Sequence, residues 1–380
     1  MRRGLGELIG AYDAEARLER ASTIPAEWYT DDRILALERQ TVFTHAWQVA
    51  GRLDQLQEPG AFVSCVLPAG EPVVVVRGSD RELRAFFNVC RHHAAAVVTA
   101  PAGSAQVLRC PYHGWTYGLD GRLKGTPDFA GVCEFDRAQN GLVPLAVDVW
   151  EGWAFVRVDT TGPSLAEFLG STLVRQARDL HLERLSWVER RVYTLGCNWK
   201  VFVDNYLDGG YHVPHLHKGL DSVLDYSSYT IENGERFCLQ WSPIVSEGAE
   251  EQTRSVRTGD RARYYWLYPN FMINVYAGAM DTNLVVPRGL DATDVIFDFY
   301  FEDASDGARA RNRASIDVSE RIQDEDVAIC ESVQRGLRSR AYGSGRLSVR
   351  REAGEHLFHR LLHHDLRAGI RAVDRGAALF

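Results

Sequence analysis

The amino-acid sequence predicts an α+β protein in which a small all-β domain precedes a larger domain of helices and strands. Its 380 residues exceed what one hydrophobic core usually fills. Short β-rich runs separated by turn residues occupy residues 46–160, whereas helical and strand patterns alternate after residue 160. We therefore expect three segments, residues 1–45, 46–160 and 161–380.

The first segment, residues 1–45, is predicted to be helical. Its glutamates Glu15, Glu19 and Glu27 lie among apolar positions, and Pro25 stands where a new helical stretch can begin. A segment of this length forms no domain alone. We expect it to pack against the third segment.

The second segment is predicted to consist of short strands. The β-rich runs cover residues 61–67, 72–77, 83–89 and 153–158, with turn residues between them. Asp120 and Gly121 lie between an aromatic run and Leu123. This pair is typical of a two-residue hairpin turn in which both residues have positive φ. We expect that hairpin to follow His113 directly.

The third segment alternates between helical and strand patterns. The predicted helices are residues 165–180, 199–212, 314–337 and 354–366. The predicted strands are residues 237–245, 272–275, 282–286 and 295–301. This mixture predicts an α+β domain.

Composition and charge favour small-molecule chemistry. Hydrophobic residues make up 45% of the chain and charged residues 25%, which is usual for a soluble protein, and no apolar run approaches the ~18 residues of a membrane span. A net charge of −8 offers no long-range attraction to nucleic acid or anionic lipid. The first residues lack the apolar stretch of a secretory signal, so we expect a cytoplasmic protein.

The seven cysteines are not expected to form disulfides, because their number is odd and the expected compartment is reducing. Two of them have neighbours that indicate metal chemistry. Cys90 is followed by His92, and Cys110 is followed by His113. Each of two loops therefore offers one thiolate and one imidazole.

This pairing predicts a Rieske-type [2Fe–2S] cluster. In such a centre two cysteines bind one iron and two histidines bind the other, and neutral imidazole raises the reduction potential. We assign Cys90, His92, Cys110 and His113 as the cluster ligands. A Cys₂His₂ zinc site is the alternative, but zinc modules usually take both cysteines from one arm and both histidines from the other. His93 is interpreted as a surface or packing residue.

A second group of candidate ligands lies within residues 198–217. On a helix Asp204, Asp208 and His212 would share one face. Pro214 disfavours helical geometry at the preceding residue, so the chain is expected to turn there and bring His217 toward His212. We assign the latter two as ligands of a mononuclear metal. His215 is expected to pack or to support a ligand rather than to bind the metal itself, and His356, His359, His363 and His364 are expected to pack or to face solvent.

The metal also needs a carboxylate, because two histidines and one carboxylate leave open positions on iron(II) where O₂ and substrate can meet. Residues 323–326 are predicted to open a helix whose apolar residues lie at positions 3, 4, 7 and 11 after Asp326. Asp326 therefore points inward and is the predicted third ligand. The alternative is that it serves, like Asp324 and Glu325, as a favourable charge in the first helical turn.

In its two metal signatures, and in their order, the chain from about residue 44 to 366 resembles the α subunits of Rieske non-haem iron oxygenases, the aromatic-ring-hydroxylating dioxygenase family. The resemblance implies an all-β Rieske [2Fe–2S] domain joined to a helix-grip (Bet v1/START-like) catalytic domain with an antiparallel sheet. It also implies a homotrimer, and electrons from NAD(P)H that arrive through a separate ferredoxin or flavin reductase.

Within that family, residues 204–214 and 280–287 look most like plant choline monooxygenases. The resemblance implies hydroxylation of a methyl group of choline or a related quaternary ammonium compound. Two alternatives stay open: dioxygenation of an aromatic ring, and a zinc-stabilised small-molecule-binding protein without catalysis. For a trimethylammonium group the candidate contacts are aromatic rings, since such a cation is attracted to ring faces. These candidates are Trp241, Tyr265, Trp266, Phe271 and Tyr276.

The sequence departs from the family pattern at two positions. His93 stands where relatives commonly have arginine, and Gly209 stands where they have the carboxylate that links the two metal sites of neighbouring subunits. Asp208 is the predicted replacement for that carboxylate, with His113 of a neighbouring subunit as its partner and Asp204 as the next candidate. We assign Asp208 and Asn205 as candidate catalytic residues.

Overall fold

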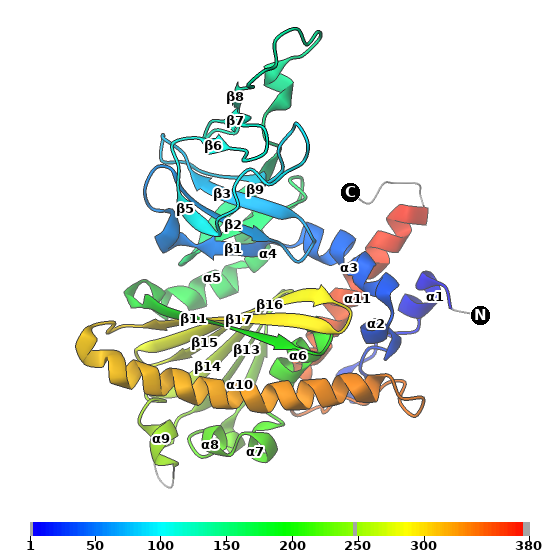
Figure 1. The fold of residues 1–380 in the computed structure, drawn as a ribbon. Helices are drawn as coiled ribbons and strands as arrows, with labels where there is room; N and C mark the ends of the chain where they lie inside the picture. The colour runs from blue at the N-terminus through cyan, green and yellow to red at the C-terminus, as the bar shows by residue number, and fades with distance from the viewer. Residues whose placement is uncertain (1–2, 246–248, 375–380) are drawn as a thin grey trace. The chain divides into compact units, whose positions relative to one another are not determined.

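The computed structural model describes residues 3–245 and 249–374 and divides the chain into two compact units (Figure 1). The β unit is Phe43–Phe168, and the helix–sheet unit combines Met1–Val42 with Leu169–Phe380. The sequence-based ranges 1–45 and 161–380 include residues 1–2, 246–248 and 375–380, which lie outside the described part. The α+β class predicted from the sequence is confirmed.

The β unit contains an antiparallel sheet with strand order β1-β10-β9-β4-β3-β2-β5 and a smaller sheet with order β6-β7-β8. Its strands are β1 (Gln48–Arg52), β2 (Ala61–Val66), β3 (Pro72–Arg77), β4 (Leu83–Phe87), β5 (Ala102–Ser104), β6 (Leu108–Arg109), β7 (Thr116–Tyr117), β8 (Leu123–Gly125), β9 (Pro144–Trp150) and β10 (Trp153–Arg157).

Strand β3 separates two hydrophobic clusters because successive side chains of a strand point to opposite faces. Val73 and Val75 belong to the cluster that contains Val63, whereas Val74 and Val76 belong to the other. The second cluster also includes Cys90, Cys110, Trp115 and Tyr117. The loops that carry the predicted cluster ligands are therefore anchored on one face of this sheet.

The predicted hairpin forms between β7 and β8, but its turn differs from the prediction. Of Asp120 and Gly121 only the glycine has positive φ, at 79°. The connection is longer than two residues, and the N–H of Gly121 donates to the carbonyl of Gly118. A Cβ at Gly121 would lie 2.4 Å from a ring carbon of Phe86, so this position accepts only glycine.

The helix–sheet unit contains an antiparallel sheet with strand order β11-β17-β16-β15-β14-β13-β12. Its strands are β11 (Ser186–Leu195), β12 (Thr230–Asn233), β13 (Phe237–Pro243), β14 (Arg261–Leu267), β15 (Phe271–Tyr276), β16 (Ala279–Gly289) and β17 (Ala292–Phe301). Strands β11, β12 and β14 were not predicted from the sequence. The long helix α10 runs along this sheet in Figure 1, and it packs against α6, which also contacts α11.

The helices are α1 (Leu5–Gly10), α2 (Glu27–Thr30), α3 (Asp32–His45), α4 (Leu165–Leu169), α5 (Ser171–Arg178), α6 (Trp199–Leu207), α7 (Val213–Leu216), α8 (Lys218–Asp221), α9 (Glu251–Arg254), α10 (Arg309–Leu337) and α11 (Ala353–Asp374). Short 3-10 helices cover Leu18–Arg20, Leu53–Leu56, Arg137–Asn140, Leu182–Arg184, Tyr226–Ser228 and Asp306–Ala308. Among the described residues, no helix has both the length and the apolar character needed to cross a membrane.

Two predicted helices end or break earlier than expected, in both cases at glycine. The helix predicted over residues 165–180 is interrupted at Gly170, which has φ 80°. The helix predicted over 199–212 ends at Leu207, because Gly209 and Gly210 both have φ 68°. Left-handed glycines are a common way to end a helix, since they carry no Cβ that would clash.

A buried ion pair joins α3 to α6. The Nζ of Lys200 lies 2.7 Å from Oε1 of Glu38, and both side chains are fully buried. The indole N–H of Trp199 donates to the other carboxylate oxygen at 2.7 Å. Burial raises the pKa of Glu38 and lowers that of Lys200, so removal from water opposes the charged form of each group. Each charge is therefore tolerated only because the other is present.

We expect Lys200→Met to destabilise the helix–sheet unit by about 3–5 kcal/mol, because it leaves the Glu38 carboxylate buried without its partner. The temperature of thermal unfolding measures this loss. The double variant Glu38→Leu/Lys200→Met removes both charges and should recover a large part of it. Strictly additive losses for Glu38→Leu and Lys200→Met would contradict the argument.

Candidate metal centres

Two loops of similar geometry carry the candidate cluster ligands. In each loop the cysteine carbonyl accepts from the N–H of the residue four positions later, Ala94 or Gly114. Each of those two residues has positive φ, 60° for the alanine and 71° for the glycine. The N–H of each cysteine donates to the carbonyl five positions later. Both loops therefore fold back tightly and direct their side chains to one place.

The donor side chains in these loops suit a cluster with mixed sulfur and nitrogen ligands. Cys90 and Cys110 are buried and not joined in a disulfide. The rings of His92 and His113 lie 4.8 Å apart between centroids. The Nδ1 atom of His92 is buried and has no hydrogen-bond partner in the described chain, which fits an atom that binds a metal. Thiol and imidazole donors together are the donor set of a Rieske centre.

His93 lies closer to these residues than the sequence suggested. Its ring centroid is 4.1 Å from that of His92, and ligating atoms of His92, His93 and His113 all lie within 4.8 Å of one another. Desolvation, together with the neighbouring imidazoles, lowers the pKa of His92 and so favours its neutral, ligating form.

Aromatic side chains cover the candidate cluster site. Trp115 stacks on His92 with a centroid distance of 4.7 Å and packs edge-on against Phe129 and Phe135. The hydroxyl of Tyr117 lies 3.3 Å from the Sγ of Cys90 and accepts from the backbone N–H of Arg91. Hydrogen bonds to ligating sulfur and a low local polarity are the means by which a protein sets a cluster potential.

The second group of donors forms where the chain turns after α6. His212 stands at the start of α7, Pro214 occupies its first turn, and His217 follows its end. Between α6 and His212, the Asp208 carboxylate accepts from the backbone N–H groups of Tyr211 and His212 and lies 2.6 Å from the Nδ1 of His212. One side chain thus holds both the turn and the imidazole ring.

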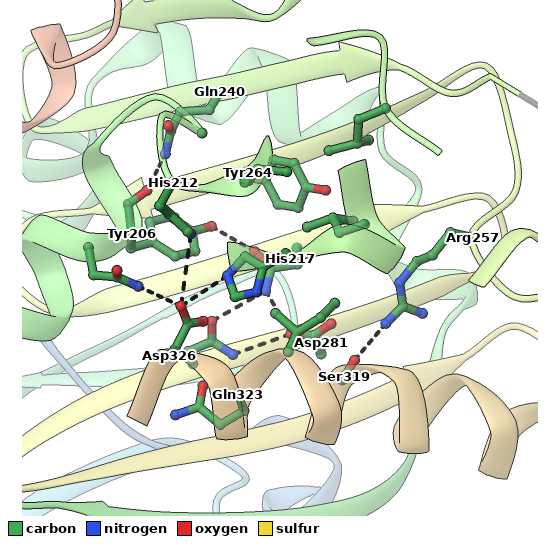
Figure 2. A pocket seen from close by; sticks show the side chains of 18 of the residues that line it. Tyr206, His212, His217, Gln240, Arg257, Tyr264, Asp281, Ser319, Gln323 and Asp326 are labelled. Atoms are coloured by element: carbon green, nitrogen blue, oxygen red, sulfur yellow. Dashed lines mark hydrogen bonds and ion pairs between the residues drawn. The ribbon is translucent and has the colours of Figure 1, made fainter. Parts of the chain in front are cut away.

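Asp326 supplies the carboxylate that the two histidines face (Figure 2). Its Oδ1 lies 3.1 Å from the Nε2 of His217 and 3.9 Å from the Nε2 of His212. The side-chain amide of Asn205 donates to the same oxygen at 2.8 Å. The ligating atoms of the three residues all lie within 4.8 Å of one another. Two imidazoles and one carboxylate in this arrangement fit a non-haem iron(II) site.

Glu325 corrects the sequence interpretation of residues 323–326. They do not open a helix, since α10 begins at Arg309 and they lie within it. Glu325 is not merely a helix-end charge, because its Oε2 lies 2.6 Å from the Nδ1 of His217. Burial disfavours protonation of His217, but Asp326 and Glu325 outweigh that effect and raise its pKa. In the described structure both candidate iron histidines have a carboxylate on the ring nitrogen away from Asp326.

Asp204 does not join this group. Its carboxylate accepts from the Tyr29 hydroxyl at 2.5 Å and lies 3.0 Å from the Nε2 of His359, which is fully buried. The expected helical face shared by Asp204, Asp208 and His212 is absent because the helix has ended at Leu207.

The turn at Gly209 has no room for the carboxylate that the family resemblance leads one to expect there. Its φ of 68° belongs to the left-handed region, and a Cβ built on it would lie 2.1 Å from the carbonyl oxygen of Arg351. The backbone of this turn therefore excludes any side chain there. Asp208, one residue earlier, is the carboxylate that reaches His212.

A pocket adjoins the three candidate iron ligands and contains one of the five predicted substrate residues. Tyr276 lines it, whereas Trp241, Tyr265, Trp266 and Phe271 do not. Trp266, for example, packs against Phe358 and Tyr268, and its indole N–H donates to the carbonyl of Pro269. Sequence reasoning missed several residues of the pocket, namely Gln240, Arg257, Tyr264, Asn274, Asp281 and Asn283. For Gln240 and Asn274 the signal is a polar residue between apolar neighbours in a strand.

Two family models match the chain. Residues 46–136 match the Rieske [2Fe-2S] domain, and residues 182–366 match the ring hydroxylating alpha subunit (catalytic domain). The chain is 40% identical over 373 residues to the chloroplastic choline monooxygenase of Arabidopsis thaliana, and the match covers 96% of this chain and 87% of that protein. The chain belongs to the Rieske non-haem iron oxygenase α subunits.

Two further relatives bear on this oxygenase. It is 30% identical over 365 residues to the carnitine monooxygenase oxygenase subunit of Escherichia coli K12, with 93% of this chain and 95% of that protein covered. A solved quaternary ammonium Rieske monooxygenase superposes with a TM-score of 0.83 at 28% identity and covers 92% of this chain and 96% of its own. The family prediction is confirmed. Membership in this family indicates an oxidoreductase with a Rieske cluster and a mononuclear iron, and it argues against the alternative of a zinc-stabilised binding protein.

We expect His212→Ala, His217→Ala and Asp326→Ala each to lose the mononuclear iron while the cluster absorbance stays, because the two donor groups lie on separate segments. Cys90→Ala should show the reverse. Iron content per chain and the visible spectrum measure both outcomes. Asp324→Ala is the matched control and should keep both metals. Full iron content in Asp326→Ala would transfer the carboxylate role to Asp324 or Glu325.

Proposed function

We propose that this oxygenase hydroxylates a methyl group of choline or a related quaternary ammonium compound. One atom of O₂ enters the C–H bond, and the other is reduced to water with electrons from NAD(P)H. A hydroxylated carbon beside nitrogen can then be oxidised further or leave as formaldehyde. The relatives support this substrate class, since their names refer to choline, carnitine and quaternary ammonium compounds.

The observation that carries the proposal is the set of tyrosine rings around the pocket at the candidate iron site. Tyr206, Tyr229, Tyr264 and Tyr276 line it. Burial raises the pKa of each phenol, so all four stay neutral and offer uncharged ring faces. A trimethylammonium group cannot donate ordinary hydrogen bonds, and each ring face attracts it by about 0.5–2 kcal/mol.

The roles of the site residues follow from their contacts. We assign His212, His217 and Asp326 as iron ligands, and Cys90, His92, Cys110 and His113 as cluster ligands. Iron(II) held by two histidines and one carboxylate supplies activation of O₂ at its open positions. Asn205 holds the Asp326 carboxylate through its amide. Asp208 and Glu325 bond the second ring nitrogens and so direct each Nε2 toward the iron position.

Electrons are proposed to come from a separate ferredoxin or flavin reductase, as in oxygenases of this family. We propose a homotrimer in which the Asp208 carboxylate of one subunit meets His113 of its neighbour. His113 is exposed on the β unit, and Asp208 already bonds the candidate iron ligand His212. Such a bridge would orient both rings and lower the reorganisation that accompanies electron transfer. The cytoplasmic location remains a prediction.

Product analysis tests the substrate class. With O₂, NAD(P)H and a surrogate reductase, we expect hydroxylated or demethylated products from one or more of choline, glycine betaine and carnitine. Simple aromatic compounds should give none, because the pocket presents hydroxyl, amide and charged groups beside its rings. Dihydroxylated products from aromatic compounds, with the quaternary ammonium compounds unchanged, would favour ring dioxygenation instead.

A second experiment tests Asp208. We expect Asp208→Asn to keep both metals, the trimer and a reducible cluster, yet to form almost no product over many turnovers. The reduced cluster should also be reoxidised more slowly by O₂ in the presence of substrate. The visible spectrum follows this reoxidation.

Glu325→Gln is the matched control for Asp208→Asn, since Glu325 bonds the other candidate iron histidine at the same 2.6 Å. If the two carboxylates only orient the histidine rings, both variants should lose turnover alike, by about 10–100-fold. A bridge through Asp208 predicts a far larger loss in Asp208→Asn. Near-normal turnover in that variant would mean that electrons take another path.

A further inference from the structure

A row of polar side chains crosses the sheet on the face that lines the pocket. The strand register pairs Gln240 with Tyr264, Tyr264 with Asn274, and Asn274 with Asp281, from β13 to β16. All four residues line the pocket beside the candidate iron ligands. Asp281 is the one acid of this row, and Figure 2 shows it between the iron group and Arg257.

Asp281 is a buried carboxylate that forms no ion pair within the described part of the chain. Its side chain accepts from the amides of Asn274 at 2.7 Å and Asn283 at 3.2 Å, and both bonds go to Oδ1. No lysine or arginine in residues 3–245 and 249–374 forms an ion pair with it. Burial raises its pKa, against the lowering effects of the Arg257 charge and of the two amides. A buried carboxylate is normally paired, so this one lacks part of its stabilisation in the free protein.

Arg257 lines the same pocket but is fixed elsewhere. Its guanidinium donates to the hydroxyls of Ser315 and Ser319, each at 2.7 Å, and its carbon lies 4.5 Å from the centroid of the Tyr276 ring. These contacts hold it on the side of α10, as Figure 2 shows for Ser319. Arg257 is therefore not the missing partner, and the Asp281 charge remains available to a ligand.

We propose that Asp281 is the counter-ion for the quaternary ammonium group of the substrate. This assignment rests on the proposed function and makes it more specific, because it names the residue that selects a positive charge. Tyr264, whose hydroxyl lies 3.1 Å from that of Tyr276, lines the same pocket, and its ring adds a face to the cation site. A quaternary ammonium ion has no N–H to donate, so a fixed carboxylate attracts it by charge alone.

Two ligands of the same shape and different charge test the proposal. Choline and its neutral isostere 3,3-dimethylbutan-1-ol differ in one atom, nitrogen or carbon. Their dissociation constants are measured by calorimetry on the purified oxygenase without oxygen or reductant, so that no turnover occurs. The unmodified protein should prefer choline. In Asp281→Asn the affinity for choline should fall about tenfold or more, while that for the isostere changes little.

Asp281→Asn is isosteric and keeps the oxygen that accepts from Asn274 and Asn283. Asp298→Asn is the control, since Asp298 is a buried acid of the neighbouring strand β17 that pairs with Arg190 and lines no part of the pocket. It should leave the preference for choline unchanged. Metal content and thermal unfolding verify the folding of both variants.

The outcomes separate the two proposals. A cation preference that persists in Asp281→Asn overturns the role of Asp281 and leaves the substrate class intact. An unmodified protein that binds the isostere as well as choline contradicts both.

Discussion

The convergence of two imidazole rings on one carboxylate is the constraint on which the catalytic half depends. His212 and His217 come from the turn after α6, whereas Asp326 comes from the middle of α10, yet their ligating atoms lie within 4.8 Å. The turn must therefore hold a fixed shape. Gly209 and Gly210 adopt a conformation that residues with a Cβ rarely take, and the Asp208 carboxylate closes the turn through two backbone N–H groups.

A carboxylate bonded to each histidine ring also fixes the orientation of that ring. Asp208 bonds the Nδ1 of His212, and Glu325 bonds the Nδ1 of His217. A bond at that nitrogen fixes the tautomer and leaves the other nitrogen free to bind metal. The two carboxylates differ in their supports, because one belongs to a turn and the other to a long helix. The turn residue is the one proposed to meet another subunit.

Two buried charges outside the pocket form an ion pair, whereas two buried charges inside it do not pair with each other. Away from it, Lys200 and Glu38 pair directly and satisfy each other. Within it, Asp281 and Arg257 do not pair with each other, because amides hold the first and serine hydroxyls hold the second. Removing a charge from water is costly, so an unpaired buried charge is expected where a ligand completes it. The proposed role of Asp281 would make the polar row across β13 to β16 the part of the fold that selects the substrate.

The sequence by itself determined the family and the α+β class, and it predicted the donor residues, because the identity and spacing of cysteines, histidines and acids are local properties of the chain. It also pointed to Asp208, which lies close to His212 along the chain. Only the tertiary structure decided that α6 ends at Leu207, that Glu325 reaches His217, and which aromatic rings line the pocket. Strand register also brought together Gln240, Tyr264, Asn274 and Asp281, which sequence reasoning had missed. Residues on adjacent strands become neighbours only through pairing, which a linear pattern does not encode.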